Sequence, residues 1–115
     1  MAKTDLTFEE LNNALGGNAI VFAGNNNDIL ISVKAVTGDD KDALANDGVI
    51  ETIYKLTEAC AKAQDTANES LPSGERLNSF NGGSFSPPAD GYVTVTQSQT
   101  VQIPLNTATV VGTNV

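Results

Sequence analysis

Four aspartates crowd one short segment, and such a cluster is the first place to look for a bound metal ion. Asp39, Asp40, Asp42 and Asp47 offer the carboxylate oxygens that Ca²⁺ and Mg²⁺ prefer. Their order departs from an EF-hand loop, because Leu44 occupies the third ligand position counted from Asp40 and no glycine follows correctly. We therefore interpret the aspartates as solvated residues that cap turns and the next helix, and we predict no metal and no cofactor.

Nucleophilic and phosphate-binding chemistry is poorly supported. A reactive Cys60 needs a histidine, a cation or a helix N-terminus to lower its pKa, and the chain contains no histidine. We interpret Cys60 as a small buried hydrophobe. The run Ser73-Gly74-Glu75-Arg76 lacks the glycine spacing and the lysine of a P-loop. Arg76, the only arginine, is expected to bind a carboxylate of this chain or of a partner.

Composition excludes several further classes of function. The chain has 115 residues, enough for one domain, and a net charge of −8, which opposes binding to nucleic acid and to anionic membranes. No apolar stretch has the length of a signal peptide or a membrane span. We expect a non-enzymatic protein that is made in a cytosol and is either kept there or packaged from it.

The first half of the chain predicts a helix and a β-hairpin. Thr7 and Glu10 form a capping-box pattern at the start of a helix over Phe8–Leu15, and Gly16-Gly17 ends it. Two β-branched runs, 19–23 and 29–36, flank a turn-forming Gly-Asn-Asn-Asn-Asp segment and predict a hairpin. The first run is apolar on both faces, which is typical of a central strand.

The strongest periodic signal predicts a helix over Val49–Ala67. Its apolar residues recur at spacings of 3 and 4 and form one stripe. The stripe consists of Val49, Ile53, Leu56, Cys60, Ala63 and Ala67. The stripe fits packing on the chain's own sheet, and it also fits a seam between identical chains.

The remainder predicts a loop and then an uncharged β segment. Residues 68–90 are rich in Pro, Ser and Gly and predict a long loop. Residues 91–115 contain no charged side chain and alternate in the β sense, with a second hairpin turning near Gln97–Gln99. Pro104 fits an edge strand or ends the pairing, and residues from 106 onward form a further strand or an arm.

These elements define an α+β fold in which the longer helix packs on a small, mainly antiparallel sheet that the C-terminal strands complete. Residues 1–90 form the core, and residues 91–115 belong to the same domain or reach a neighbouring copy. Natural sheet edges usually carry charges, so an uncharged segment is expected to be covered. The residues expected at contacts between subunits are Arg76, Phe80, Phe85, Tyr92, Val93, Val95, Val101, Ile103 and Leu105.

In its size, acidity, uncharged C-terminal segment and abundance of Asn, Thr, Gly and Val, the chain resembles small virion proteins of tailed bacteriophages, above all capsid decoration or cement proteins. The resemblance implies adhesion to a major capsid protein on the outside of the head, often as dimers or trimers, and therefore location in the virion. Its partners are then other copies of itself and a larger structural protein.

Two other classes of function remain open. One is a small cytosolic bacterial module that binds a protein or peptide along an exposed sheet edge. The other is an enzyme that uses the Asp39–Asp47 carboxylates with a divalent ion.

Overall fold

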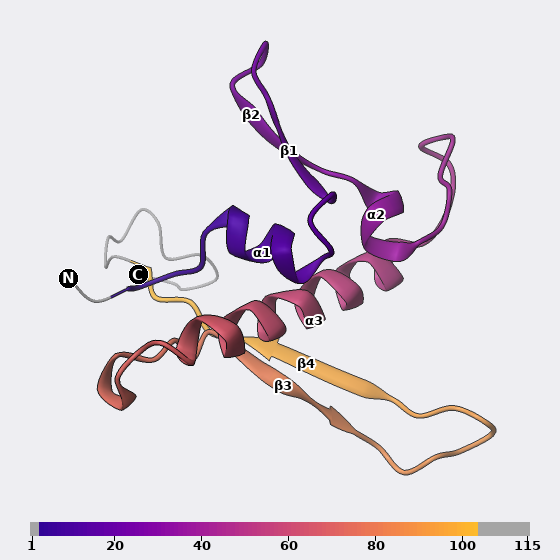
Figure 1. The fold of residues 1–115 in the computed structure, drawn as a ribbon. Coiled ribbons are helices and arrows are strands. Elements are labelled where there is room, and N and C mark those ends of the chain that lie inside the picture. Colours follow the sequence, from indigo (N-terminus) through magenta and orange to yellow (C-terminus); the bar gives the residue numbers. More distant parts are fainter. Residues whose placement is uncertain (1–2, 104–115) are drawn as a thin grey trace, which may run out of the picture.

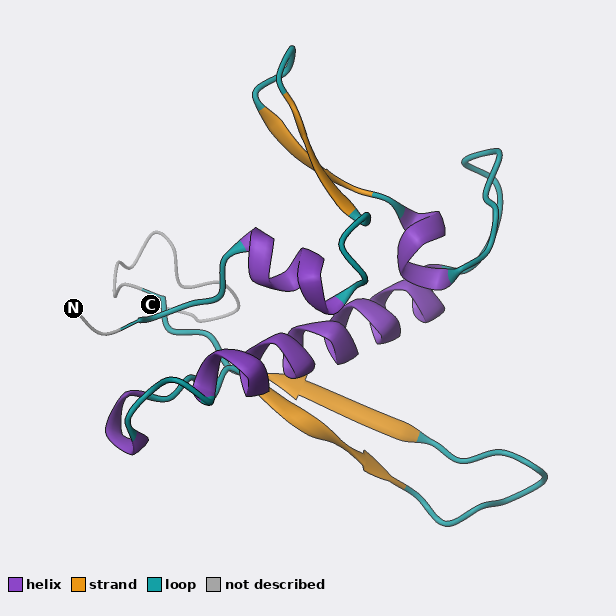
Figure 2. Cartoon of the chain, viewed as in Figure 1, coloured by secondary structure: helices purple, strands orange, loops and turns teal. Residues whose placement is uncertain are grey.

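The computed structural model describes residues 3–103 and has the α+β class that the sequence predicts (Figures 1 and 2). Two antiparallel hairpins project from a group of helices, of which the longest is central. In chain order the elements are α1 (Phe8–Ala14), β1 (Ile20–Ala23), β2 (Asp28–Ile31), α2 (Val33–Thr37), α3 (Val49–Asn68), the 3₁₀ turn η1 (Ser73–Glu75), β3 (Phe80–Phe85) and β4 (Val95–Gln99).

Helix α1 begins with the predicted capping box. The Glu10 N–H donates to Thr7 Oγ1 over 3.1 Å, and the Thr7 N–H donates to Glu10 Oε1 over 2.7 Å. Lys3 Nζ lies 2.9 Å from the same carboxylate. The Lys3 side chain, followed by the Thr7 backbone N–H, lowers the pKa of Glu10 from its ordinary value of 4.5. Leu11 is the buried residue of this helix.

The first hairpin is shorter than predicted. Ile20 pairs with Ile31 and Ala23 with Asp28, so the strands end where the second run was expected to continue to residue 36. The correction has a local cause, because Ser32 Oγ accepts the Ala35 N–H over 3.1 Å and caps α2. The run 19–23 was also predicted to be a central strand, which is wrong, since β1 belongs to a sheet of two strands.

The second hairpin corrects two further predictions. Strand β3 lies within the segment 68–90 that was expected to be a loop, and it pairs with β4 in a register that runs from Phe80↔Gln99 to Phe85↔Val95. The predicted turn near Gln97–Gln99 is wrong, because these residues lie inside β4. The two hairpins form separate sheets rather than one shared sheet. The predictions for Pro104 and for residues 106 onward lie outside the described residues.

Side-chain amides from the helices hold the hairpins in place. Gln64 Nε2 donates to the Phe80 carbonyl over 2.8 Å and Gln64 Oε1 accepts the Phe80 N–H over 3.0 Å. One turn later on α3, Asn68 makes the same two-bond pairing with the backbone of Leu77, at 2.9 and 2.7 Å. Together these four bonds, here called the α3 clamp, fix the start of β3 on the helix.

The core of the described residues is small. Its buried apolar residues are Leu11, Ala19, Val36, Ala59 and Ala63, so three of the five are alanines. The stripe predicted on α3 is therefore only partly inside: Ala63 is buried, whereas Val49 and Ile53 are 69% and 58% exposed. The Cα radius of gyration is 17.0 Å, against about 13 Å for a compact chain of this length. None of the helices between residues 3 and 103 combines the length and apolar composition needed to cross a bilayer.

Candidate interaction surface

The β1–β2 hairpin, here called the ribbon (Ile20–Ile31), exposes large apolar side chains on both of its faces. Phe22 is 66% exposed and Leu30 is 48% exposed. Residues directly opposite each other in an antiparallel pair share a face, so the register assigns Phe22 and Ile29 to one face and Val21 and Leu30 to the other. Figure 1 shows the ribbon projecting away from α3. Both faces are therefore available for contact.

The edges of the ribbon are less available than its faces. The Ser32 N–H donates to the Ala19 carbonyl, so the alternating ladder directs the N–H groups of Ile20 and Ile29 outward. The Ile20 N–H already donates to Asn12 Oδ1 over 2.9 Å, and the Ile29 N–H donates to the carboxylate of Asp28 over 2.8 Å. The same ladder also directs the N–H groups of Phe22 and Ile31 outward, so side chains satisfy one of the two outward donors on each strand and leave only a short edge for the addition of an extended peptide.

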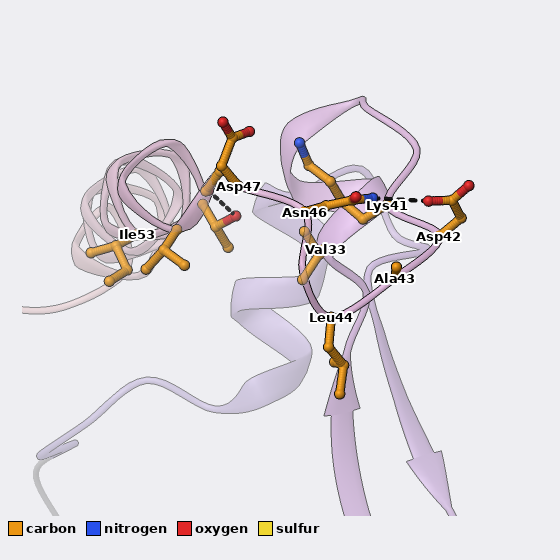
Figure 3. A pocket seen from close by; sticks show the side chains of 11 residues that line it. Val33, Lys41, Asp42, Ala43, Leu44, Asn46, Asp47 and Ile53 are labelled. Atoms are coloured by element: carbon orange, nitrogen blue, oxygen red, sulfur yellow. Dashed lines mark hydrogen bonds between the residues drawn. The ribbon is translucent and has the colours of Figure 1, made fainter.

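A second apolar surface begins at the base of the ribbon. An open depression of about 600 Å³ lies between α2, the loop that follows it and the start of α3. In Figure 3, Val33 and Leu44 lie on one side of this depression and Ile53 lies on the other. Leu44 is fully exposed. The rim carries Asp42, whose Oδ1 accepts the side-chain amide of Asn46 over 3.0 Å, so the apolar floor has a polar border.

The apolar surface continues from α3 to the second hairpin. Ile53 also lines a neighbouring depression of about 500 Å³, together with Ile50, Val93 and Val95. Gln97 Nε2 donates to the Tyr54 carbonyl over 3.3 Å and holds β4 beside α3 at this point. The whole surface is here called the apolar strip. Its residues are Val33, Leu44, Val49, Ile50, Ile53 and Val93.

The structure places the sequence-predicted contact residues in several locations. Val93 belongs to the apolar strip and the half-buried Val95 lines the same depression, whereas Phe80 is half-buried on the α3 clamp. The other described members of the set are exposed elsewhere: Phe85, Tyr92, Val101 and Ile103. Leu105 lies outside the described residues. The predicted set is therefore not brought together as one site.

Within residues 3–103, Arg76 does not make the internal carboxylate contact that was one of its two predicted roles. Its Nε donates to the Leu71 carbonyl over 3.2 Å, and the side chain is exposed. The ion pairs found in residues 3–103 are Lys3–Glu10 and Lys34–Asp40. A contact between Arg76 and a carboxylate of another chain stays a prediction.

The aspartate cluster does not assemble into a ligand set. In the described part of the chain, no group of three or more acidic or cysteine side chains has the geometry to hold a metal ion. Asp40 pairs with Lys34 over 2.8 Å, and Asp47 borders the depression at the start of α3. The predicted capping of the next helix by an aspartate is wrong, because the N-cap of α3 is Gly48, at a φ of 124° that favours glycine.

Cys60 lies half-buried on α3. Burial raises the pKa of its thiol, and the negative charge of Asp5 raises it further. Both effects keep the sulfur protonated and unreactive at neutral pH. The geometry therefore supplies no activated nucleophile at this position.

Sequence reasoning predicted the hairpin but missed the ribbon as an exposed apolar surface, and it missed most of the apolar strip. The usable signal was charge: residues 18–33 contain one ionic group, Asp28, in sixteen positions. That segment is almost as free of charge as the segment 91–115 on which the sequence analysis concentrated. The apolar pattern of the run 19–23 predicted a central strand, whereas the fold leaves Val21 and Phe22 exposed.

Comparison with family models, with curated proteins and with solved structures finds no match to this chain.

Proposed function

We propose that this protein is a structural subunit of a multi-copy assembly, of the capsid decoration or cement kind, and acts by adhesion between subunits. The observation that carries the proposal is the contrast between a core made largely of alanines and a ribbon and strip that expose valine, leucine, isoleucine and phenylalanine. Transfer of such side chains out of water is favourable by about 1.5–3 kcal/mol each when burial is complete. An assembly supplies the burial that the isolated chain lacks.

The shape of the molecule supports adhesion rather than catalysis. The two hairpins extend in different directions from α3 (Figure 2), so one subunit can contact more than one neighbour. The apolar strip is open and shallow, with a polar rim, as interaction surfaces are. Val93 connects the strip to the uncharged segment 91–115.

Location on a virion follows from the same proposal. An acidic, extended subunit that attaches through apolar surfaces fits the outside of a protein shell. The partner there is a larger structural protein such as a major capsid protein, and the bound subunits reinforce the head against the pressure of the packaged DNA.

The test is whether the protein co-sediments with phage particles. Phage particles from an infected or induced culture that produces this chain are separated on a density gradient, and the chain is detected in each fraction. We expect it in the particle fraction, and we expect particles without it to release DNA at a lower temperature. A chain that stays with the soluble protein, with particles of unchanged heat stability, contradicts the proposal.

A pair of variants tests the contact surface itself. Ile50→Asp with Ile53→Asp places two charges in the apolar strip and is expected to release the protein from particles. The matched control is Thr66→Asp with Ser70→Asp, which adds the same two charges at exposed positions near the end of α3 and outside the strip. Equal attachment of both proteins contradicts a role of the strip.

A further inference from the structure

Much of the acidity of this chain is concentrated beside the apolar strip. Residues 39–51 hold five of its fourteen acidic residues and one of its six basic residues. This segment runs from the end of α2 into the first turn of α3, and it supplies most of the lining of the depression of about 600 Å³. The most exposed apolar residue of the strip, Leu44, therefore lies within the most acidic part of the chain.

A second depression, here called the acidic depression, adjoins the apolar one at the start of α3. It has a volume of about 570 Å³, and Lys41 and Asp47 line both. Its carboxylates come from Asp39, Asp47 and Glu51, and Lys41 is the basic residue among the described residues that line it. In Figure 3 the Asp47 carboxylate and the Leu44 side chain point in opposite directions. The two depressions thus place an acidic surface and an apolar surface side by side.

The carboxylates of the acidic depression are not neutralised by ion pairs of their own chain. Neither of the ion pairs found in residues 3–103 includes one of them. Lys55 follows Glu51 by four positions on α3, a spacing at which the two side chains could pair. Its Nζ donates instead to the Thr37 carbonyl over 3.3 Å. Carboxylates grouped in this way attract a cationic partner.

The combination of acidic and apolar surfaces selects among possible occupants. Nucleic acid and anionic membranes are repelled by the carboxylates. A second copy of this chain brings a net charge of −8 and is repelled as well. The chain's own segment 91–115 has no basic side chain to place beside the carboxylates. The matching occupant is a segment of another protein that carries both apolar side chains and lysine or arginine.

The shape of the apolar strip indicates how that segment is arranged. Ile53 lines both apolar depressions, so the apolar surface continues across α3 from Leu44 to Val93. The residues of the strip come from helices and loops, which offer no strand edge for backbone pairing. An amphipathic helix meets both conditions, because its apolar side chains recur along one face and its charged side chains flank that face.

We propose that the apolar strip and the acidic depression together bind a basic amphipathic helix of a partner protein. Its apolar face lies on the strip, and its lysine or arginine side chains lie beside Asp39, Asp47 and Glu51. The apolar contact supplies most of the affinity, whereas the charges orient the helix and speed association. The inference deepens the proposed function and rests on it for its setting, since the helix then belongs to the larger structural protein.

The first test uses synthetic peptides as probes. The basic probe is about 18 residues long, or about five helical turns, with leucine at spacings of 3 and 4 and lysine at the flanking positions. Two matched peptides replace every lysine by glutamate or every leucine by serine. We expect the native protein to bind the basic probe, and to bind each matched peptide at least about 10-fold more weakly in calorimetry. No binding of the basic probe, or equal binding of the glutamate peptide, overturns the proposal.

Variants of the apolar strip test whether the probe binds there. Leu44→Ser with Ile53→Ser is expected to raise the dissociation constant of the basic probe by about 30-fold or more, as loss of central apolar contacts does. Both side chains are exposed, so the fold is expected to be retained. The matched control is Val21→Ser with Leu30→Ser, which removes two exposed apolar side chains of the ribbon. Equal weakening in both proteins contradicts binding at the strip.

Variants of the acidic depression test the role of charge. Asp47→Asn with Glu51→Gln is expected to raise the dissociation constant by about 3-fold or more and to reduce its dependence on salt, because exposed charge pairs are screened. The matched control is Asp65→Asn with Glu69→Gln, which removes the same charge at exposed positions near the end of α3. Equal weakening in both proteins means that the probe responds to net charge alone, and contradicts the site.

A reporter dye tests the location without weakening the surface. In a Cys60→Ser background, Ala43→Cys places a polarity-sensitive dye in the lining of the apolar depression, and Ser70→Cys places it at an exposed position elsewhere. We expect the basic probe to shift the dye emission to shorter wavelength at position 43 and to change it little at position 70. The reverse pattern contradicts the assignment.

The binding surface and the proposed function fail separately. A protein that binds the basic probe at the strip but never reaches particles retains the surface and refutes the role as a decoration protein. A protein that reaches particles, but neither binds the probe nor responds to the changes at Asp47 and Glu51, retains the role and refutes the basic helix.

Discussion

The two hairpins differ in the polarity of their sequences and in how they are hydrogen-bonded to the helices. The β3–β4 hairpin has a polar sequence, with Gly, Ser, Thr, Asn and Gln in its strands, and it is fixed to α3 by the α3 clamp and by Gln97. The ribbon has an apolar sequence, and its link to the helices lies at its base, where Asn12 accepts the N–H groups of Ala19 and Ile20. Both hairpins are largely exposed, but the polar one is bonded to α3 near the start of β3 and at Gln97, whereas the apolar one is bonded to the helices only at its base.

The comparison teaches that attachment to the helices in this chain does not follow hydrophobicity, because the more polar hairpin makes more hydrogen bonds to α3. A buried amide that pairs with a backbone N–H and C=O specifies one geometry, whereas apolar side chains accept any dry surface. The polar hairpin therefore has one place on its own chain. The ribbon's apolar faces suit a surface on another molecule.

Removal of the second hairpin is the strongest test of this contrast. A chain that ends at Gly91 loses β4 and leaves β3 unpaired, while Leu11, Ala59 and Ala63 between α1 and α3 are retained. We expect attachment to particles to be lost and most of the helical circular dichroism signal to remain. Complete unfolding of the shortened chain instead means that the helices need β4 in order to fold, and that the helices and the second hairpin form one cooperative unit.

Removal of the α3 clamp is expected to have the next largest effect, on the free energy of unfolding. Gln64→Ala leaves the N–H and the carbonyl of Phe80 without partners in a partly buried place, which is expected to cost about 2–4 kcal/mol of unfolding free energy. Urea denaturation measures the loss. The matched control is Gln97→Ala, whose single 3.3 Å bond is expected to contribute about 1 kcal/mol or less. Equal losses contradict the special role of the clamp.

Loss of the Asn12 hydrogen bonds at the base of the ribbon is expected to destabilise the ribbon and to leave α3 unchanged. Asn12→Ala removes an acceptor for two backbone N–H groups and a donor to the Gly17 carbonyl, and is expected to cost about 1–2 kcal/mol. Hydrogen exchange of the Ile20–Ile31 amides is expected to accelerate, while exchange within α3 changes little. Asn13→Ala, at an exposed neighbouring position, is the control. Equal acceleration in both hairpins means that they are coupled.

The smallest effect is a pH dependence at α1, the helix that carries Asn12. The pKa of Glu10 is lowered in the folded state, so its charge stabilises the helix above the ordinary value of 4.5, and the contribution is lost as the pH falls through the lower folded-state value. Because the Glu10 side chain is about one-third exposed and its ion pair with Lys3 is screened by solvent, we expect a few tenths of a kcal/mol. Glu10→Gln removes this dependence below the ordinary carboxyl pKa of 4.5 in thermal unfolding, and Glu9→Gln is the control. An unchanged profile contradicts the assignment.

Local signals in the sequence predicted the helices well. The Thr7–Glu10 capping box and the spacing of apolar residues along 49–67 depend on neighbours within four positions, so no distant contact is needed to interpret them. The same local reasoning failed at Ser32, where a serine that fits a strand on the surface acts instead as the cap of α2.

Strand β3 and the interaction surface could not be predicted in this way. The sequence Phe-Asn-Gly-Gly-Ser-Phe has little β propensity, and it becomes a strand because Gln64, sixteen positions earlier, holds Phe80 beside α3. For the apolar residues of the ribbon, the pattern alone is typical of a core. Whether such residues are buried depends on which other segments of the chain pack against them.

The amino-acid sequence by itself determined the α+β class, the capping box of α1, the approximate lengths of α1 and α3, and an acidic chain with two segments nearly free of charge. These properties follow from backbone bonding within a few residues and from composition. Only the tertiary structure decided where each hairpin is attached to the helices, the first at Asn12 of α1 and the second at Gln64 of α3. The physical reason is that a buried amide selects its backbone partner by geometry across many positions of the chain, a relation that neither periodicity nor composition records.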